Sequence, residues 1–299
     1  MHKLYVIRRL HLWVMKQATL FRTIVLSDLH LGTAGSRAKE ATDFLKYHSC
    51  QKLILNGDII DGWQLRQQGV WKKKHTAFFK VVLKQIVHHD TKVIYLRGNH
   101  DDFLDQVLPL QVGKNFRIQR DHLLKSDKKT FYVTHGDVFD SITSHMKWLA
   151  HLGDIGYTFL LWVNKFYNQY RAWRGLAYYS LSQVVKQRIK TAVSYISDFE
   201  EKLTELARAR GCDGIICGHI HQPAIREIGG IVYMNSGDWV ESMSALVEDH
   251  NGSWHLLYYS DNMVSDNADT ETDLTDDEVP LSIGQPLQQA ILTSLLTTP

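Results

Sequence analysis

Short runs of apolar residues alternate, in the first part of the chain, with longer segments in which apolar residues recur every three or four positions. The runs lie at 23–27, 52–56 and 92–97, and the segments with helical spacing lie at 37–48 and 71–89. Uninterrupted apolar runs of this length are typical of strands buried on both faces. Alternating strands and helices favour right-handed crossovers between largely parallel strands. We therefore expect an α/β fold.

The pattern changes after residue 116. Apolar runs at 116–119 and 129–136 predict two further strands, whereas 141–210 contains no proline and few strand signals and predicts several helices. Strands resume at 214–217. Four closely spaced runs follow, which we expect to form antiparallel strands, at 224–228, 231–236, 244–249 and 254–260.

These patterns divide the chain into a main domain and three additional segments. The expected boundaries are 22–140 and 211–260 for the main domain, 141–210 for a helical cap insertion, 1–21 for a basic and apolar leader, and 261–299 for an acidic, disordered tail.

Charge is distributed unevenly along the chain. The net charge is +2, but the residues from Asp261 onward contain eight acids and no Lys or Arg, which leaves +10 for the rest. The net charge of +10 on the residues before Asp261 suits anionic partners such as phosphates, nucleic acid or an acidic membrane surface. Three cysteines without metal-type spacing fit a reducing compartment, and no apolar run is long enough to cross a membrane. We expect a cytoplasmic protein.

Polar residues follow five of the predicted strands at the point where each strand ends. They are Asp28 and His30, Asp58 and Asp61, Asn99 to Asp101, His135 and Asp137, and His219 and His221. In a parallel sheet the carboxyl ends of the strands share one edge, where open α/β folds bind ligands. Carboxylate, amide and imidazole groups suit Mn²⁺, Fe or Zn²⁺. The set is too large for one tetrahedral ion and suits two ions that share a bridging ligand.

The order of these motifs resembles the calcineurin-like metallophosphoesterase superfamily over roughly residues 22 to 260. The motifs are Asp-x-His, Gly-Asp-x-x-Asp, Gly-Asn-His-Asp, His-Gly-Asp and Gly-His-x-His. The resemblance implies two packed mixed β-sheets flanked by helices, with a dinuclear metal site. One ion would be held by Asp28, His30, Asp58 and His221, and the other by Asp58, Asn99, His135 and His219. Mn²⁺ is the expected metal, with Fe or Zn²⁺ as alternatives.

The resemblance also implies roles for residues around the ions. His100 would stabilise the transferring phosphoryl group or protonate the leaving oxygen, and Asp101 would orient His100. Asp61 and Asp137 would hydrogen-bond ligand imidazoles. Because alternate residues of an extended segment point the same way, His219 and His221 are both expected to face the site.

The predicted insertion at 141–210 is dense in aromatic residues and carries basic ones, so we expect it to form a substrate groove above the metals. The candidate substrate-binding residues are Lys165, Arg171, Arg174, Lys186, Arg188 and Lys190. Together with Gly-Asp-Ile-Ile-Asp-Gly-Trp and Asn-Ser-Gly-Asp-Trp-Val-Glu, this pattern is similar to the UDP-2,3-diacylglucosamine pyrophosphatase branch. That branch cleaves the diphosphate of a lipid A precursor. The chain departs from one subgroup by having His100 where that subgroup has Arg.

Three interpretations of function follow. The first is hydrolysis of a lipid-linked or nucleotide diphosphate, with peripheral binding at the cytoplasmic face of the inner membrane through the cap and the N-terminal segment. The second is a general phosphodiesterase or phosphatase that acts on nucleotides, nucleic acid or phosphoprotein. The third is a scaffold without activity, which the complete ligand set disfavours.

Overall fold

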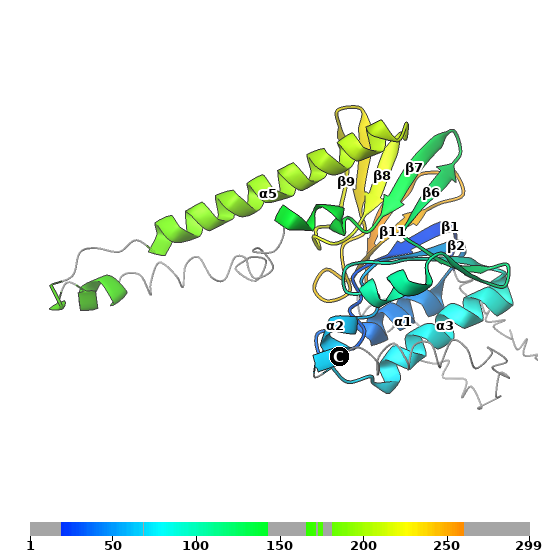
Figure 1. Cartoon of the computed structure of the whole chain (residues 1–299), viewed down its shortest axis with the longest axis horizontal. Helices are drawn as coiled ribbons and strands as arrows, with labels where there is room; N and C mark the ends of the chain where they lie inside the picture. The colour runs from blue at the N-terminus through cyan, green and yellow to red at the C-terminus, as the bar shows by residue number, and fades with distance from the viewer. Residues whose placement is uncertain (1–18, 68, 143–165, 172, 176–180, 260–299) are drawn as a thin grey trace, which may run out of the picture.

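The computed structural model describes residues 19–67, 69–142, 166–171, 173–175 and 181–259. Four layers are stacked in it: two helices, a seven-stranded sheet, a five-stranded sheet and a long helix (Figure 1). The first layer contains α1 (Ala38–Tyr47) and α3 (Lys73–His89), and the last layer is α5 (Leu181–Ala209). This is the α/β fold of two packed mixed sheets flanked by helices that the sequence predicts.

The seven-stranded sheet has the order β12-β11-β1-β2-β3-β5-β4. Its strands are β1 (Thr19–Leu26), β2 (His48–Asn56), β3 (Lys92–Leu96), β4 (Leu110–Val112), β5 (Phe116–Gln119), β11 (Ser244–Glu248) and β12 (Trp254–Tyr258). β1, β2, β3 and β5 are parallel, whereas β4, β11 and β12 run antiparallel to their neighbours. β1 begins at Thr19, inside the segment that we expected to be a leader.

The five-stranded sheet has the order β6-β7-β8-β10-β9. Its strands are β6 (Asp121–Ser126), β7 (Lys129–Thr134), β8 (Gly214–Cys217), β9 (Ala224–Ile228) and β10 (Ile231–Asn235). The expectation that the last four strands are antiparallel is confirmed for β9, β11 and β12, whereas β10 is antiparallel to β9 but parallel to β8. β9 lies at the edge of this sheet, and its three central residues are exposed. β11 and β12 join the other sheet beside β1.

Alternating side chains along the buried strands connect these layers. In β1, Ile24 and Leu26 pack in the cluster that faces α1 and α3, while Val25 packs between the two sheets. In β8, Ile216 lies between the sheets and Ile215 packs in the cluster beneath α5. Each central strand therefore contributes to two cores, which explains why its sequence is apolar at successive positions.

α5 is one continuous helix of 29 residues within the segment 141–210, for which several helices were expected, and residues 166–171 of that segment are helical as well. Phe199, Leu203 and Ala207, near its C-terminal end, pack against the five-stranded sheet. A helix of this length spans about 43 Å at 1.5 Å per residue, and its N-terminal half extends beyond the sheets (Figure 1). Among the described residues, none of the helices combines the length and apolar character that crossing a membrane requires. Residues 1–18, 143–165 and 260–299 of the predicted leader, cap and tail lie outside the described residues.

Candidate metal centre

Both sheets deliver polar side chains to the same end of the sandwich. Asp28 and His30 follow β1, Asp58 follows β2, and Asn99 and His100 follow β3 in the seven-stranded sheet; His135 follows β7, and His219 and His221 follow β8 in the five-stranded sheet. The sequence predicts that all these residues lie at one edge of a single sheet, whereas in the structure they come from the edges of two sheets that meet here. Because β1–β3 are parallel to one another, as are β7 and β8, their carboxyl ends can converge.

The backbone at these strand ends is left-handed. The φ angles of Asp28, His30, Asp58, His219 and His221 are 53°, 47°, 53°, 71° and 55°. This conformation is uncommon for residues other than glycine and clusters at functional sites. His219 and His221 therefore do not lie on an extended segment, contrary to the expectation, although both reach the site.

Two glycines allow the carboxylates to approach the backbone closely. A Cβ atom on Gly98 would lie 2.3 Å from Asp58 Oδ1, and one on Gly218 would lie 2.5 Å from Asp28 Oδ2. Such distances are far inside van der Waals contact. The glycines of Gly-Asn-His-Asp and Gly-His-x-His are therefore required by the space that the two carboxylates occupy.

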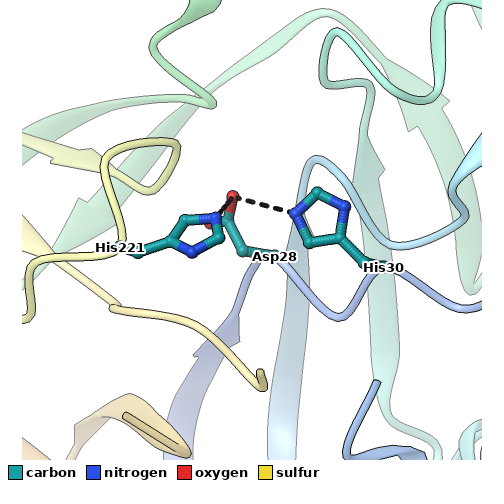
Figure 2. Close-up of side chains that lie close together, drawn as sticks. All are labelled: Asp28, His30 and His221. Atoms are coloured by element: carbon teal, nitrogen blue, oxygen red, sulfur yellow. Dashed lines mark ion pairs between the residues drawn. The ribbon is translucent and has the colours of Figure 1, made fainter. Parts of the chain in front are cut away.

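Three groups of side chains place their ligand atoms within 4.8 Å of one another: Asp28, His30 and His221 form the first, Asp58, His135 and His219 the second, and His30, Asp61 and His100 the third. In the first, Asp28 Oδ1 lies 3.2 Å from His221 Nε2 and 4.0 Å from His30 Nε2, between the two rings (Figure 2). In the second, His135 Nε2 lies 3.3 Å from Asp58 Oδ2 and 3.3 Å from His219 Nδ1. Each of the first two groups resembles one side of a two-ion centre.

Asp58 belongs to the second group and also approaches His30 of the first. Its Oδ2 atom is 3.3 Å from His135 Nε2 and 3.9 Å from His30 Nε2, a position from which one carboxylate can serve two ions. Within the described part of the chain, the buried Oδ1 atom of Asn99 has no hydrogen-bond donor. A buried carbonyl oxygen without a donor is costly unless a cation or water satisfies it. The residues present therefore fit a pair of divalent cations.

The field at this centre is strongly negative. Burial lowers the pKa of His135, but the charges of Asp58 and Asp28 outweigh burial and raise it to about 10. For His221, burial is likewise outweighed by Asp28, and its pKa rises to about 8. The carboxylates thus attract protons onto the imidazoles. Divalent cations would take the place of these protons, because metal binding requires neutral imidazole and releases the proton.

Asp61 holds two imidazoles with one oxygen. Its Oδ2 atom lies 3.1 Å from His30 Nδ1 and 3.0 Å from His100 Nδ1, while its Oδ1 accepts the backbone N–H of Gln64. The contact with His30 matches the predicted role of Asp61 behind a ligand imidazole. The contact with His100 was assigned to Asp101 by the sequence argument.

The assignments of Asp101 and Asp137 differ in the structure. Asp101 is fully buried, and its carboxylate accepts the backbone N–H groups of Ile59 and Ile60 and the hydroxyl of Tyr95. Burial and then the charge of Asp58 raise the pKa of Asp101 to about 7. Asp101 therefore fixes the loop that carries Asp58 and does not orient His100.

Asp137 accepts a hydrogen bond from Arg97, whereas the Nδ1 atom of His135 lies 2.9 Å from the backbone oxygen of Asn56. A peptide carbonyl thus takes the place behind His135 that the sequence argument gave to a carboxylate. No residue-type pattern could indicate this contact, because any residue offers a backbone oxygen. The sequence argument did not include Tyr95 among the site residues, because it lies within the apolar run of β3 and its hydroxyl donates to the buried carboxylate of Asp101.

Two of the predicted substrate-binding residues, Arg171 and Arg174, are not placed above the metals. Arg171 and Arg174 belong to the segment beyond the N-terminal end of α5, away from both sheets (Figure 1). Arg171 Nη1 donates to Tyr167 Oη at 3.5 Å. These two arginines are distant from the centre because α5 continues past the sheets instead of folding over them. Lys186, Arg188 and Lys190 are part of α5, and Lys165 lies outside the described residues.

Comparison with known proteins agrees with this geometry. The family model described as calcineurin-like phosphoesterase matches residues 21–223, more than half of the chain. The chain therefore belongs to the calcineurin-like phosphoesterase family, and it is a metal-dependent hydrolase of phosphoesters. No curated protein matches it.

Among solved structures, three similar chains are a phosphoesterase from E. coli called Yfce, a novel archaeal phosphodiesterase, and Vps29 complexed with zinc from Entamoeba histolytica. Their sequence identities are 18%, 12% and 11%, and their TM-scores are 0.38, 0.38 and 0.37. The matches cover 80%, 79% and 80% of this chain and 99%, 98% and 99% of the others.

Proposed function

We propose that the protein hydrolyses a phosphoester or diphosphate with two divalent cations, of which Mn²⁺ suits the carboxylate, amide and imidazole ligands. One ion would be held by Asp28, His30, Asp58 and His221, and the other by Asp58, Asn99, His135 and His219. The observation that carries the proposal is the position of Asp58, whose Oδ2 atom lies near one imidazole of each group.

Two such cations, when bound, supply a water of lowered pKa and positive charge for the phosphate oxygens. The protein's own contribution is orientation. Asp61 holds Nδ1 of His100 at 3.0 Å, which leaves Nε2 directed to the side of Asp58, 3.9 Å from its Oδ2. From this position Nε2 can donate a hydrogen bond to a phosphate oxygen or a proton to the leaving oxygen. No covalent intermediate with the protein is needed.

The substrate that we propose is the diphosphate of a UDP-linked acylated sugar, a lipid A precursor. Two features support it: the resemblance of the Gly-Asp-Ile-Ile-Asp-Gly-Trp segment to that branch, and the exposed aromatic side chains beyond α5. These are Phe166, Tyr167, Tyr170 and Trp173. Aromatic residues beside Arg171 and Arg174 suit the interface of an acidic membrane, so we also propose peripheral binding at the cytoplasmic face of the inner membrane.

A substrate panel tests this proposal. Purified protein loaded with Mn²⁺ is offered UDP-diacylglucosamine, a cyclic nucleotide, a phosphopeptide, single-stranded DNA and bis(p-nitrophenyl) phosphate. We expect metal-stimulated release of UMP from the first, with the highest kcat/KM of the panel. A higher kcat/KM for any other natural compound would assign the protein to general phosphodiesterases or phosphatases. Absence of metal-stimulated turnover on all five would contradict the proposal entirely.

A further inference from the structure

An exposed tryptophan lies against the imidazole of His100. The ring centroids of Trp63 and His100 are 4.3 Å apart and their planes are inclined by 35°. Trp63 is 40% exposed, and its Nε1–H donates to Asp102 Oδ2 at 3.2 Å. A large aromatic ring is thus held at the edge of the site with part of its surface accessible from solvent.

The position of Trp63 is fixed by the backbone around it. The preceding residue, Gly62, donates its N–H to the backbone oxygen of His100 at 3.0 Å. A Cβ on Gly62 would lie 2.8 Å from Phe103, so glycine is required for this close approach. Arg66 Nη2 lies 3.8 Å from the other oxygen of the same carboxylate, Asp102 Oδ1. The short helix α2 (Gly62–Gln67), which carries Trp63, is therefore joined to the segment His100–Asp102 by a backbone hydrogen bond and by side-chain contacts with Asp102.

His100 stands between Trp63 and the metal ligands. One face of its ring meets the indole, and its Nε2 atom lies 3.9 Å from Asp58 Oδ2. A phosphate held at the centre would therefore have an exposed aromatic ring one imidazole away. A nucleobase is joined to its 5′-phosphate through a ribose, which gives it the reach to cover this separation. Every base has a π-face, so stacking on an indole suits bases in general.

A second tryptophan provides a matched comparison. Trp71 is 41% exposed, and its Nε1–H donates to Thr76 Oγ1 at 2.9 Å. Its ring is stacked on Phe79, with centroids 6.2 Å apart. The two tryptophans therefore have the same exposure and the same kind of anchor, but only Trp63 is packed on a side chain of the site.

We propose that Trp63 is a stacking subsite for the base of a nucleotide whose phosphate binds at the metal centre. The inference rests on the proposed function and adds to it the residue that recognises the uridine end of the substrate. It makes Trp63 a specificity residue, because a phosphate ester without a planar base would gain nothing from the indole.

The test measures the affinities of UMP and ribose 5-phosphate by calorimetry with Mn²⁺-loaded wild type, Trp63→Leu and Trp71→Leu. In wild type we expect UMP to bind about 5- to 150-fold more tightly than ribose 5-phosphate, the range that stacking of one base contributes. Trp63→Leu should bring this ratio close to one, while Trp71→Leu should leave it unchanged. Trp63→Gln serves as a second variant if Trp63→Leu does not fold, and metal content is measured in each.

Three results would overturn the subsite: a wild-type ratio near one, a ratio that survives in the Trp63 variants, or an equal loss in Trp71→Leu. Failure of both ligands to bind would overturn it as well. Hydrolysis of bis(p-nitrophenyl) phosphate by the same preparations is scored separately. Turnover that persists in wild type while the ratio is near one would remove the subsite and leave the proposed hydrolysis in place.

Discussion

Two buried carboxylates, at Glu248 and Asp58, show what distinguishes a structural acid from a metal ligand. Glu248 is 1% exposed and accepts hydrogen bonds from Thr23 Oγ1 at 2.6 Å and Ser126 Oγ at 2.5 Å. Arg22 Nη1 lies 3.4 Å away. Since Ser126 belongs to the five-stranded sheet and the others to the seven-stranded sheet, Glu248 links the two sheets with donors that the protein itself provides.

Asp58 is equally buried, but its surroundings differ. Its Oδ1 accepts the backbone N–H of His100, while its Oδ2 faces imidazole nitrogens that can act as metal ligands themselves. The nearby Asn99 Oδ1 has no donor among the described residues. Burial of a carboxylate therefore does not by itself define a metal site. What defines it is a set of neighbouring acceptors that a cation would satisfy.

The largest expected effect is that of Asp58→Ala. Removal of the proposed bridging ligand should abolish two-ion binding and lower kcat/KM on bis(p-nitrophenyl) phosphate by more than about a hundredfold, because changes one layer further from a metal already cost 10- to 100-fold. Metal content per chain and steady-state kinetics measure it, and circular dichroism checks the fold. Near-normal turnover in the metal-replete variant would show that Asp58 is a structural carboxylate like Glu248 and not a metal ligand.

A smaller loss is expected for Asp61→Asn. The variant retains the shape of the side chain but removes the charge behind His30 and His100, so kcat should fall by about 10- to 100-fold. Asp127→Asn is the control, since Asp127 pairs with Arg22 and is exposed. Kinetics of both variants with titrated Mn²⁺ provide the measurement. Asp61→Asn within twofold of wild type would exclude a role for Asp61 in orienting these imidazoles.

Glu248→Gln should affect stability and leave the metal centre unchanged. An amide can accept only at its oxygen, so one of the buried hydroxyls of Thr23 and Ser126 would lose its acceptor, at a cost of about 1–3 kcal/mol in the free energy of unfolding. Urea denaturation measures this cost. A clear drop in metal affinity instead would mean that the two carboxylates are not independent.

The smallest expected effect concerns two tyrosines. Tyr95 donates to Asp101 at 3.0 Å and Tyr132 donates to Asp121 at 2.9 Å, but only Asp101 holds the loop of Asp58. Tyr95→Phe and Tyr132→Phe should each cost about 1 kcal/mol of stability, whereas only Tyr95→Phe should weaken metal binding, by several-fold. Calorimetric titration with Mn²⁺ compares them. Equal metal affinities would limit Tyr95 to a role in stability.

Much of the fold could be predicted because the central strands are apolar at successive positions. β5, β8 and β9 have the predicted bounds, whereas β4 and β6 were missed. β4 has only three residues, which is too short for a recognisable pattern. β6 is half-exposed, and the charged residues Asp121 and Lys125 interrupt its apolar positions. For α5, the absence of Gly and Pro from Leu181 to Ala209 explains why this part of the predicted helical segment forms one long helix.

The types of the site residues could be predicted from the motifs, but their second contacts could not. Asp101 was assigned to its neighbour His100, yet its partners Ile59 and Ile60 lie about forty residues earlier in the chain. Which loop a side chain faces depends on how strands of the same sheet are ordered, and a local motif does not contain that order. A local pattern likewise does not indicate that α5 continues past the sheets and that the segment 166–171 lies beyond its N-terminal end (Figure 1).

The most direct test of the two-ion centre is anomalous diffraction at the manganese edge from crystals grown with Mn²⁺. We expect two peaks, one among Asp28, His30 and His221 and the other among Asp58, His135 and His219, with Asp58 bound to both ions. A single peak that does not involve Asp58, or no peak while the imidazoles remain paired with the carboxylates, would contradict it.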